Sequence, residues 1–328
     1  MTQSVADTPV SEARSPSTQP AVSVVVCVYT DRRWTDICRG LAALQAQTWP
    51  PAEVIVIADH ADDLLQRVRD AFPWVRALPN HGPRGLSAAR NTGVAAARSE
   101  IVAFVDDDAL AAPDWLEHLV APYVDDPDVV AVGGAALPAW PVERPGWFPP
   151  EFDWVVGCSY RGLPSRRSEI RNLMGCNMSF RADVLAGDPG FPIGVGRVGS
   201  KPTGCEETEL CIRIRQRREG ARIIFEPRAT VRHRVTPERT RWDYFLARCY
   251  AEGGSKALVA RHVGADDALR LERSYCFRTL PRGIVDGIRA TARGRSTGLA
   301  QAGAILVGLT ATVAGYCIAR LRRAGGSR

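Results

Sequence analysis

The chain has 328 residues, enough for one large domain with appendages or for two domains. Its 45% hydrophobic and 24% charged residues are ordinary globular values, which exclude a disordered, collagenous or coiled-coil chain. The 42 basic and 36 acidic residues leave a net charge of +6, and the basic residues form no pure patch in the sequence. We therefore expect no nucleic-acid partner.

Cysteine usage and the first residues indicate the compartment. Nine cysteines are scattered without any C-x-x-C pair, which indicates reduced, buried thiols and neither a disulfide framework nor a zinc ribbon. Residues 1–20 are rich in Ser, Thr, Pro and acidic residues and contain no apolar h-region. We interpret them as a disordered leader and expect the bulk of the chain to be cytoplasmic.

Apolar, β-branched runs alternate with helical patterns from residue 21 to residue 136. The expected strands are 21–29, 54–58, 75–78, 101–105 and 129–132. Apolar residues recur at helical spacing between them, for example from Trp34 to Leu44 and over 61–71. This alternation predicts an α/β fold with a doubly wound, mostly parallel sheet.

The pattern changes after Gly133. Residues 137–170 are rich in proline and large aromatic residues, which is typical of a substrate-contacting loop or of a packing flap. Beyond them we expect a strand at 172–180, a helix at 205–218, short strands at 223–226 and 230–234, and helices from 241 onwards.

Three consecutive carboxylates, Asp106, Asp107 and Asp108, follow the strand 101–105. Ligands bind at the carboxyl ends of strands in doubly wound sheets, and strand alternation would send Asp106 and Asp108 to one side. Two oxygen-bearing groups there suit Mg²⁺ or Mn²⁺ that bridges phosphate oxygens. The alternative is a solvated acidic turn that caps the next helix.

Six segments recur in one order along residues 22–235. They read SVVVCVYT, EVIVIAD, GLSAARNTG, IVAFVDDDA, GCNMSFRADVL and CEETELCIRIRQ. Together they resemble the GT-A-fold family 2 glycosyltransferases. The resemblance implies a Rossmann-like GT-A sheet and an inverting transfer from a nucleotide-diphosphate sugar, expected to be a UDP sugar. It also implies a D-x-D motif with Mn²⁺ or Mg²⁺, and a hydroxyl or phosphate acceptor that is lipid-linked or a secondary metabolite.

The resemblance assigns donor binding to Thr30, Asp59, Arg90, Asn91 and Asp106. Thr30 and Asp59 match positions that hold the base, and Asp106 matches the acid that contacts the ribose. Arg90 and Asn91 follow Gly85, and a helix N-terminus that begins at a glycine is by itself an anion site. The alternative for that segment is a helix that packs its small alanine face on the sheet.

The same resemblance places the catalytic base before the helix 205–218. The family usually shows Glu-Asp there, whereas this chain has Glu206-Glu207. We therefore expect Glu207 to be the base and Glu206 to be the second candidate, since Glu performs the same proton transfer from one methylene further out. A carboxylate in the first turn of a helix is also simply favourable for the helix.

Four further assignments follow from the matched positions. Asp108 and His233 are the expected metal ligands, although a lone histidine is more often structural. Asn177 matches a strand-end segment that lines the sugar pocket. Trp154, from the aromatic region, is the second residue that we place in the acceptor or sugar pocket.

The C-terminal region indicates contact with a membrane. Residues 296–319 contain no charge, and 24 helical residues would reach roughly 36 Å. They predict a membrane-associated helix that either spans the bilayer or lies on the domain or interface. The basic amphipathic stretch 282–295 favours an anionic membrane surface in both cases.

We expect three functional parts after the leader. Residues 21–136 form the nucleotide-sugar-binding half, 137–238 the acceptor-binding half of the same domain, and 239–328 the helical C-terminal region. The expected protein is a glycosyltransferase at the cytoplasmic face of the membrane. The alternative is a non-catalytic, membrane-tethered scaffold that binds nucleotide sugars. A nucleotidyl transferase is disfavoured because Tyr29–Arg33 contains no glycine for a phosphate loop.

Overall fold

A computed structural model of the chain describes residues 20–186, 190–193, 204–264 and 272–324, so the expected leader lies almost wholly outside the described residues. The strands are β1 (Val22–Val28), β2 (Glu53–Ala58), β3 (Arg76–Pro79), β4 (Ile101–Val105), β5 (Ala109–Ala111), β6 (Val129–Ala139), β7 (Ser168–Glu169), β8 (Asn177–Arg181) and β9 (Arg222–Arg234). The α-helices are α1 (Trp34–Gln45), α2 (Asp62–Ala71), α3 (Leu86–Ala96), α4 (Trp115–Asp125), α5 (Ala182–Ala186), α6 (Glu206–Arg217), α7 (Trp242–Val263), α9 (Leu280–Ala292) and α10 (Thr297–Ala324). The short helical segments are η1 (Asp31–Arg33), η2 (Pro150–Val156), η3 (Pro237–Thr240) and η4 (Tyr275–Thr279).

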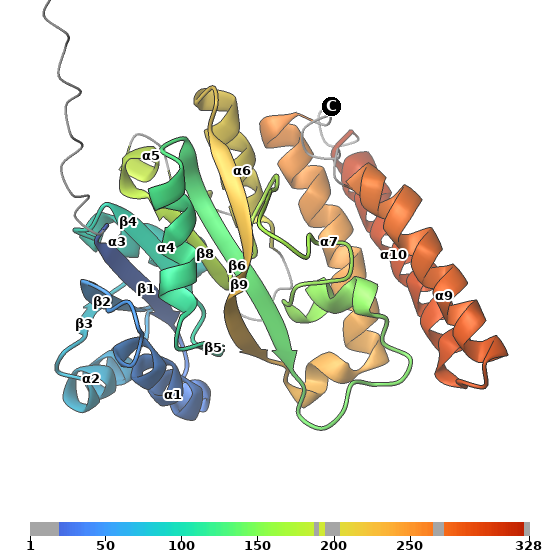
Figure 1. Cartoon of the computed structure of the whole chain (residues 1–328), viewed down its shortest axis with the longest axis horizontal. Coiled ribbons are helices and arrows are strands. Elements are labelled where there is room, and N and C mark those ends of the chain that lie inside the picture. The colour runs from blue at the N-terminus through green and yellow to red at the C-terminus, as the bar shows by residue number, and fades with distance from the viewer. Residues whose placement is uncertain (1–19, 187–189, 194–203, 265–271, 325–328) are drawn as a thin grey trace, which may run out of the picture.

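One nine-stranded sheet runs through the described part of the chain in the order β3-β2-β1-β4-β8-β6-β9-β5, and β7 also pairs with β9. The first four strands pair in parallel, as do β6 and β9. The expected α/β architecture with a mostly parallel sheet and a helical extension is confirmed (Figure 1). The strand expected at 172–180 is β8, which is shorter and inserts antiparallel between β4 and β6.

Two apolar cores cover opposite faces of the sheet because successive strand residues point to opposite sides. Val24 and Val26 pack with α1, α2 and α4 in one core, whereas Val25 packs with α3 and α6 in the other. Continuous burial of β1, β2 and β4 therefore follows from helices on both faces. All nine cysteines are free thiols, as expected, but only five of them are buried and Cys317 is exposed.

The two short strands expected at 223–226 and 230–234 form the single strand β9. Its parallel pairing with β6 jumps from Glu226 to Thr230, so the irregularity between them is absorbed within one strand. The long β9 matters for the site because its far end pairs with β5, directly after the three aspartates.

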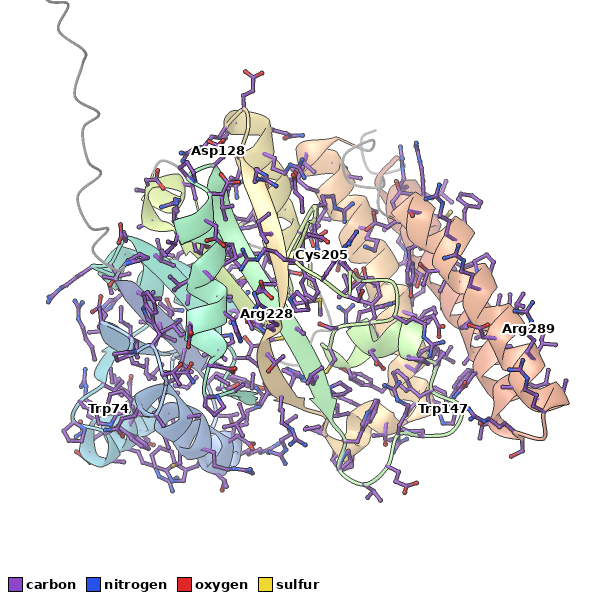
Figure 2. The ribbon with its side chains drawn as sticks, viewed as in Figure 1. Trp74, Asp128, Trp147, Cys205, Arg228 and Arg289 are labelled. Atoms are coloured by element: carbon purple, nitrogen blue, oxygen red, sulfur yellow. The ribbon has the colours of Figure 1, made fainter. Side chains whose placement is uncertain are left out.

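The C-terminal helices build a third core against the aromatic region. Phe148 and Phe152 are buried and pack against Phe245 of α7 with ring centroids 5.5 and 5.3 Å apart. Trp147 of the same region contacts Phe245 as well, and Figure 2 shows it beside the lower end of these helices. Much of the aromatic region 137–170 thus packs against the C-terminal helices. Figure 1 shows α9 and α10 as the outer layer beyond α7.

Candidate active site

A first cavity, the strand-end cavity, lies at the carboxyl ends of β1, β2 and β4. It measures about 160 Å³, and its lining includes Tyr29, Asp59, Leu86 and Asp106. Parallel strands bring these residues to one edge because their carboxyl ends lie side by side. Thr30 belongs to the same strand end, but its hydroxyl accepts the backbone N–H of Arg32 at 3.4 Å and so caps η1.

Asp59 fixes the start of α3. Its carboxylate accepts the side-chain amide of Asn80 at 2.7 Å and the backbone N–H of Gly85 at 2.9 Å. Gly85 has φ 138°, a conformation that residues with a side chain rarely adopt. Asp59 therefore orients the helix N-terminus that borders the strand-end cavity.

The acidic triplet contacts two partners, Arg33 and His233. The chain turns after β4, where Ala109 N–H donates to the carbonyl of Asp106 at 3.0 Å. Asp107 points to Arg33, with Nη1 and Oδ1 2.5 Å apart. Asp108 contacts the same Nη1 through its Oδ2 at 3.1 Å. Asp108 also meets Asp106 and His233, and one potential ligand atom from each of these three lies within 4.8 Å of the others. Asp106 and Asp108 thus come together as expected, but through a turn and with Arg33 linking Asp108 to Asp107.

His233 reaches this cluster through strand pairing. It lies in β9 opposite Ala109 of β5, the residue that follows Asp108. Its Nε2 lies 3.3 Å from Oδ1 of Asp108, and its ring contacts the site of Gly157, where an added Cβ would lie 3.0 Å from Cε1. Asp108 and His233 are far apart in the sequence, so no local sequence pattern predicts their contact.

Asp108 is a buried carboxylate that the described residues leave partly unsatisfied. Neither of its oxygens accepts a hydrogen bond from the part of the chain that the structure describes. Burial by itself would raise its pKa, but His233 and Arg33 hold the pKa well below the usual range of an aspartate. A dry, ionised carboxylate beside another carboxylate and an imidazole is a donor set that suits a divalent cation.

Arg90 and Asn91 both bind to other protein groups around the site. Arg90 is buried, with Nη1 2.9 Å from Oε1 of Glu206 and Nη2 3.3 Å from Oδ1 of Asp106. It also donates to the carbonyl of Gly175 at 2.8 Å. The amide of Asn91 exchanges hydrogen bonds of 2.9 and 2.8 Å with the backbone of Phe191.

A second cavity, the central cavity, unites most of the expected site residues. It measures about 140 Å³ and is lined by Asp106, Asp108 and His233 together with Arg90, Trp154, Glu206 and Glu207. Figure 2 shows Cys205, the residue before the two glutamates, near the middle of the molecule. Burial and the neighbouring Glu206 raise the pKa of Glu207 to about 8. Glu207 therefore lies at this cavity as a weak acid close to neutrality.

Asn177 and Trp154 have different surroundings. Asn177 is fully buried, accepts Trp115 Nε1–H at 2.8 Å, and donates to the carbonyls of Ala135 and Ala229 at 3.1 and 2.8 Å. These bonds tie β8 to its neighbours, so its contacts are those of a structural residue. Trp154 of η2 lines the central cavity.

Sequence reasoning did not single out three cations of the central cavity: Arg33, Arg239 and Arg248. Arg33 bridges Asp107 and Asp108, and Arg239 is buried with a 3.3 Å hydrogen bond to the carbonyl of Val156. No spacing in an arginine-rich sequence distinguishes them, because only folding brings them to the aspartates. The cavity therefore combines a cation-binding cluster, arginines suited to an anion, and a carboxyl group able to take a proton.

Comparisons with known proteins show which family this chain resembles. The model of the family described as glycosyl transferase family 2 matches residues 23–187. The glucosyl-dolichyl phosphate glucuronosyltransferase of Haloferax volcanii is 37% identical over 241 residues, which are 73% of this chain and 77% of that protein.

Two solved structures share the fold. A mannosyltransferase from Pyrobaculum calidifontis, in complex with GDP-Man and Mn²⁺, has a TM-score of 0.56 at 19% identity, over 92% of this chain and 89% of that chain. GalNAc-T7 with UDP, GalNAc and Mn²⁺ has a TM-score of 0.52 at 16% identity, over 72% of this chain and 48% of that chain.

Proposed function

This chain belongs to glycosyl transferase family 2, and we propose that it moves a sugar from a nucleotide-diphosphate donor to an acceptor hydroxyl with inversion at the anomeric carbon. The family resemblance expected from the six sequence segments is confirmed, and the chain is a glycosyltransferase. One observation carries the finer proposal: Glu207 lines the same cavity as Asp106, Asp108 and His233.

The donor nucleotide binds in the strand-end cavity in this proposal. Asp59 and Asp106 line this cavity, where Asp59 would contact the base and Asp106 the ribose, and Thr30 lies at the adjacent strand end. The nucleotides in the two solved neighbours, GDP-Man and UDP, support a nucleotide-diphosphate donor. A UDP sugar is the first donor to test. Arg90 and Asn91 then act by holding the framework and not by contacting phosphate.

Asp106, Asp108 and His233 would hold Mn²⁺ or Mg²⁺. The residues fit such an ion because the buried Asp108 oxygens make ion-pair contacts with Arg33 and His233 but form no hydrogen bond with the described chain. Both solved neighbours contain Mn²⁺, which supports the choice of ion. When bound, a divalent ion neutralises charge that develops on the leaving diphosphate.

Glu207 is the general base in this mechanism. Its carboxylate takes the proton of the acceptor hydroxyl while that oxygen attacks the anomeric carbon and the bond to the nucleotide diphosphate breaks. A single displacement inverts the configuration. A pKa of about 8 suits the task, since a base is most effective when its pKa lies near the working pH.

The acceptor is a lipid-linked sugar at the cytoplasmic face of a membrane. The name of the Haloferax relative, which acts on a glucosyl-dolichyl phosphate, supports this part of the proposal. The apolar helix α10 supports it as well, because the segment Thr297–Arg322 is long and apolar enough to cross a membrane.

Two variants of the purified protein test the proposal. We expect Glu207→Gln to lower sugar transfer by roughly 10²–10⁴-fold while titration calorimetry of UDP, GDP and dTDP with Mn²⁺ shows unchanged nucleotide binding. Asp108→Ala, or EDTA, should abolish that binding. Glu209→Gln, which alters a carboxylate paired with Arg213, is the control.

A full transfer rate in Glu207→Gln would contradict the base assignment. Metal-dependent nucleotide binding without transfer to a lipid-linked sugar would instead contradict the proposed acceptor.

A further inference from the structure

A third and larger cavity, the helix cavity, adjoins the site on the side of the C-terminal helices. It measures about 320 Å³, and its walls come from η2, residues 171–174, α7, η4 and α10. It shares five lining residues with the central cavity: Trp154, Met174, Cys205, Glu207 and Arg248. The two cavities therefore meet at the carboxyl group that we propose as the base.

A chain of ion pairs crosses the lining of the helix cavity. Arg248 contacts Glu252 at 2.8 Å, Lys256 contacts Glu252 at 3.3 Å and Glu272 at 2.6 Å, and Arg171 contacts Glu272 at 2.7 Å. Cationic and anionic side chains thus alternate along this part of the lining. The N–H groups of Arg248 and Lys256 lie in the cavity lining and are suitable hydrogen-bond donors for the oxygens of a phosphate group.

The remaining lining is largely apolar or aromatic. It includes Phe152, Tyr275 and Leu280, together with Leu309 and Val313 of α10. Val313 lines the cavity and is also 52% exposed, so the cavity reaches the outer surface along α10. The polar end of the cavity thus lies at Glu207 and the ion pairs, and an apolar edge lies at the surface.

α10 is held closely against α7, which makes it a fixed wall of this cavity. A Cβ added to Gly253 of α7 would lie 2.0 Å from the carbonyl oxygen of Thr312, and one added to Gly315 would lie 2.0 Å from that of Tyr250. Only glycine permits helices to approach so closely. The close packing of α10 against α7 therefore depends on glycines in both helices.

The outer side of α9 and α10 is apolar with basic residues among and around it. Exposed apolar side chains are Phe277, Val285, Ile288, Leu299, Leu306, Val307, Val313 and Leu321. Exposed arginines are Arg282, Arg289, Arg293, Arg295, Arg320 and Arg322, against one exposed acid, Asp286. Figure 2 shows Arg289 at the outer edge of the molecule. Such a surface suits the interface of an anionic bilayer, where apolar groups enter the lipid and arginines meet phosphates.

We propose that the helix cavity is the binding site of a lipid-linked acceptor, and that α10 lines the path of its hydrocarbon chain to the bilayer. This inference rests on the proposed function. The acceptor is an amphiphile that consists of a sugar, a phosphate and a long hydrocarbon. Its sugar hydroxyl meets Glu207, its phosphate faces Arg248 and Lys256, and its chain leaves past Leu309 and Val313.

Binding of farnesyl phosphate to the full-length protein, measured by calorimetry below the micellar concentration of the ligand, tests the site without any need for turnover. We expect Val313→Trp to weaken binding by at least about tenfold, because the larger side chain narrows the mouth. Val307→Trp is the matched control: this residue is 42% exposed on the same helix and does not line the helix cavity. Farnesol, which lacks the phosphate, should bind more weakly than farnesyl phosphate.

Equal binding by Val313→Trp and Val307→Trp, or no binding to the wild type, would overturn the site. Equal affinity for farnesol would overturn the role of the cations. A wild type that binds farnesyl phosphate at this site but transfers no sugar would contradict the proposed function alone. The binding measurement therefore tests the lipid site, and the transfer measurement tests the proposed function.

Discussion

Arg90 and Glu206 form a buried ion pair, in which Nη1 of Arg90 lies 2.9 Å from Oε1 of Glu206 and both side chains are at most 5% exposed. The pair joins α3 to α6, and Arg90 also contacts Asp106 and the carbonyl of Gly175. Glu206 is therefore neutralised inside the framework, whereas Glu207 lines both the central and the helix cavity. This difference is why we propose Glu207 as the base.

Arg90→Met should be strongly destabilising because it leaves the carboxylate of Glu206 buried without a cation. We expect a loss of roughly 3–5 kcal/mol in the free energy of unfolding, as is typical for half of a buried pair. Chemical denaturation measures it. The double variant Arg90→Met/Glu206→Met should recover much of the loss, and a double variant less stable than Arg90→Met would contradict this explanation.

The rate of sugar transfer should rise with pH and level off above about 8. Burial and Glu206 raise the pKa of Glu207 from 4.5 to about 8, so the carboxyl is protonated below that pH and cannot accept a proton. Between pH 4.5 and 8, Glu207 therefore keeps its proton in the folded state and has lost it in the unfolded state. The contribution of Glu207 to stability therefore falls as pH rises from 4.5 to 8.

A profile of kcat on both sides of pH 8 checks the first expectation. Glu207→Gln should remove the corresponding slope from the pH dependence of unfolding. A rate that does not change with pH across this range would exclude Glu207 as a base of this pKa.

His233→Ala should weaken Mn²⁺ binding more than the roughly 10–100-fold typical for loss of an outer-shell partner. The reason is that His233 supplies one of the three potential ligand atoms. Mn²⁺ titration in the presence of UDP measures the affinity. Asp107→Asn is the control, because Asp107 points to Arg33 and should change the affinity much less. Comparable losses in the two variants would indicate a general charge effect.

Two adjacent glycines of α7 should respond to alanine in opposite directions. Gly253→Ala would place its Cβ 2.0 Å from the carbonyl oxygen of Thr312, so we expect a loss of about 1–3 kcal/mol from overpacking. Apart from its chain neighbours and the backbone of its own helical turns, no described atom lies within 4 Å of a Cβ added to Gly254. Gly254→Ala should therefore stabilise the helix by up to about 1 kcal/mol.

Thermal or chemical unfolding of the two variants side by side provides the comparison. If Gly253→Ala were as stable as Gly254→Ala, α10 would not be packed against α7 as the structure shows.

Much of the N-terminal half could be predicted from local patterns. The apolar runs became β1, β2 and β4 because a strand covered by helices on both faces needs apolar residues throughout. The three aspartates could be placed at a strand end because the run stops there. The apolar segment near the C-terminus is the helix α10 for the same kind of local reason: length and composition suffice.

The sequence by itself thus determined most of the helices and the main strands of this protein, the family that its motifs indicate, and the strand ends where the polar groups collect. Only the tertiary structure decided which groups meet. Arg90 and Glu206 pair across 116 residues, and His233 joins Asp108 because β9 returns beside β5. Periodicity reports which face of an element is buried, but a contact between distant segments depends on how those faces pack. For the same reason, the motifs could locate Asn91 and Asn177 in the sequence but could not show that their side-chain amides bind backbone carbonyls.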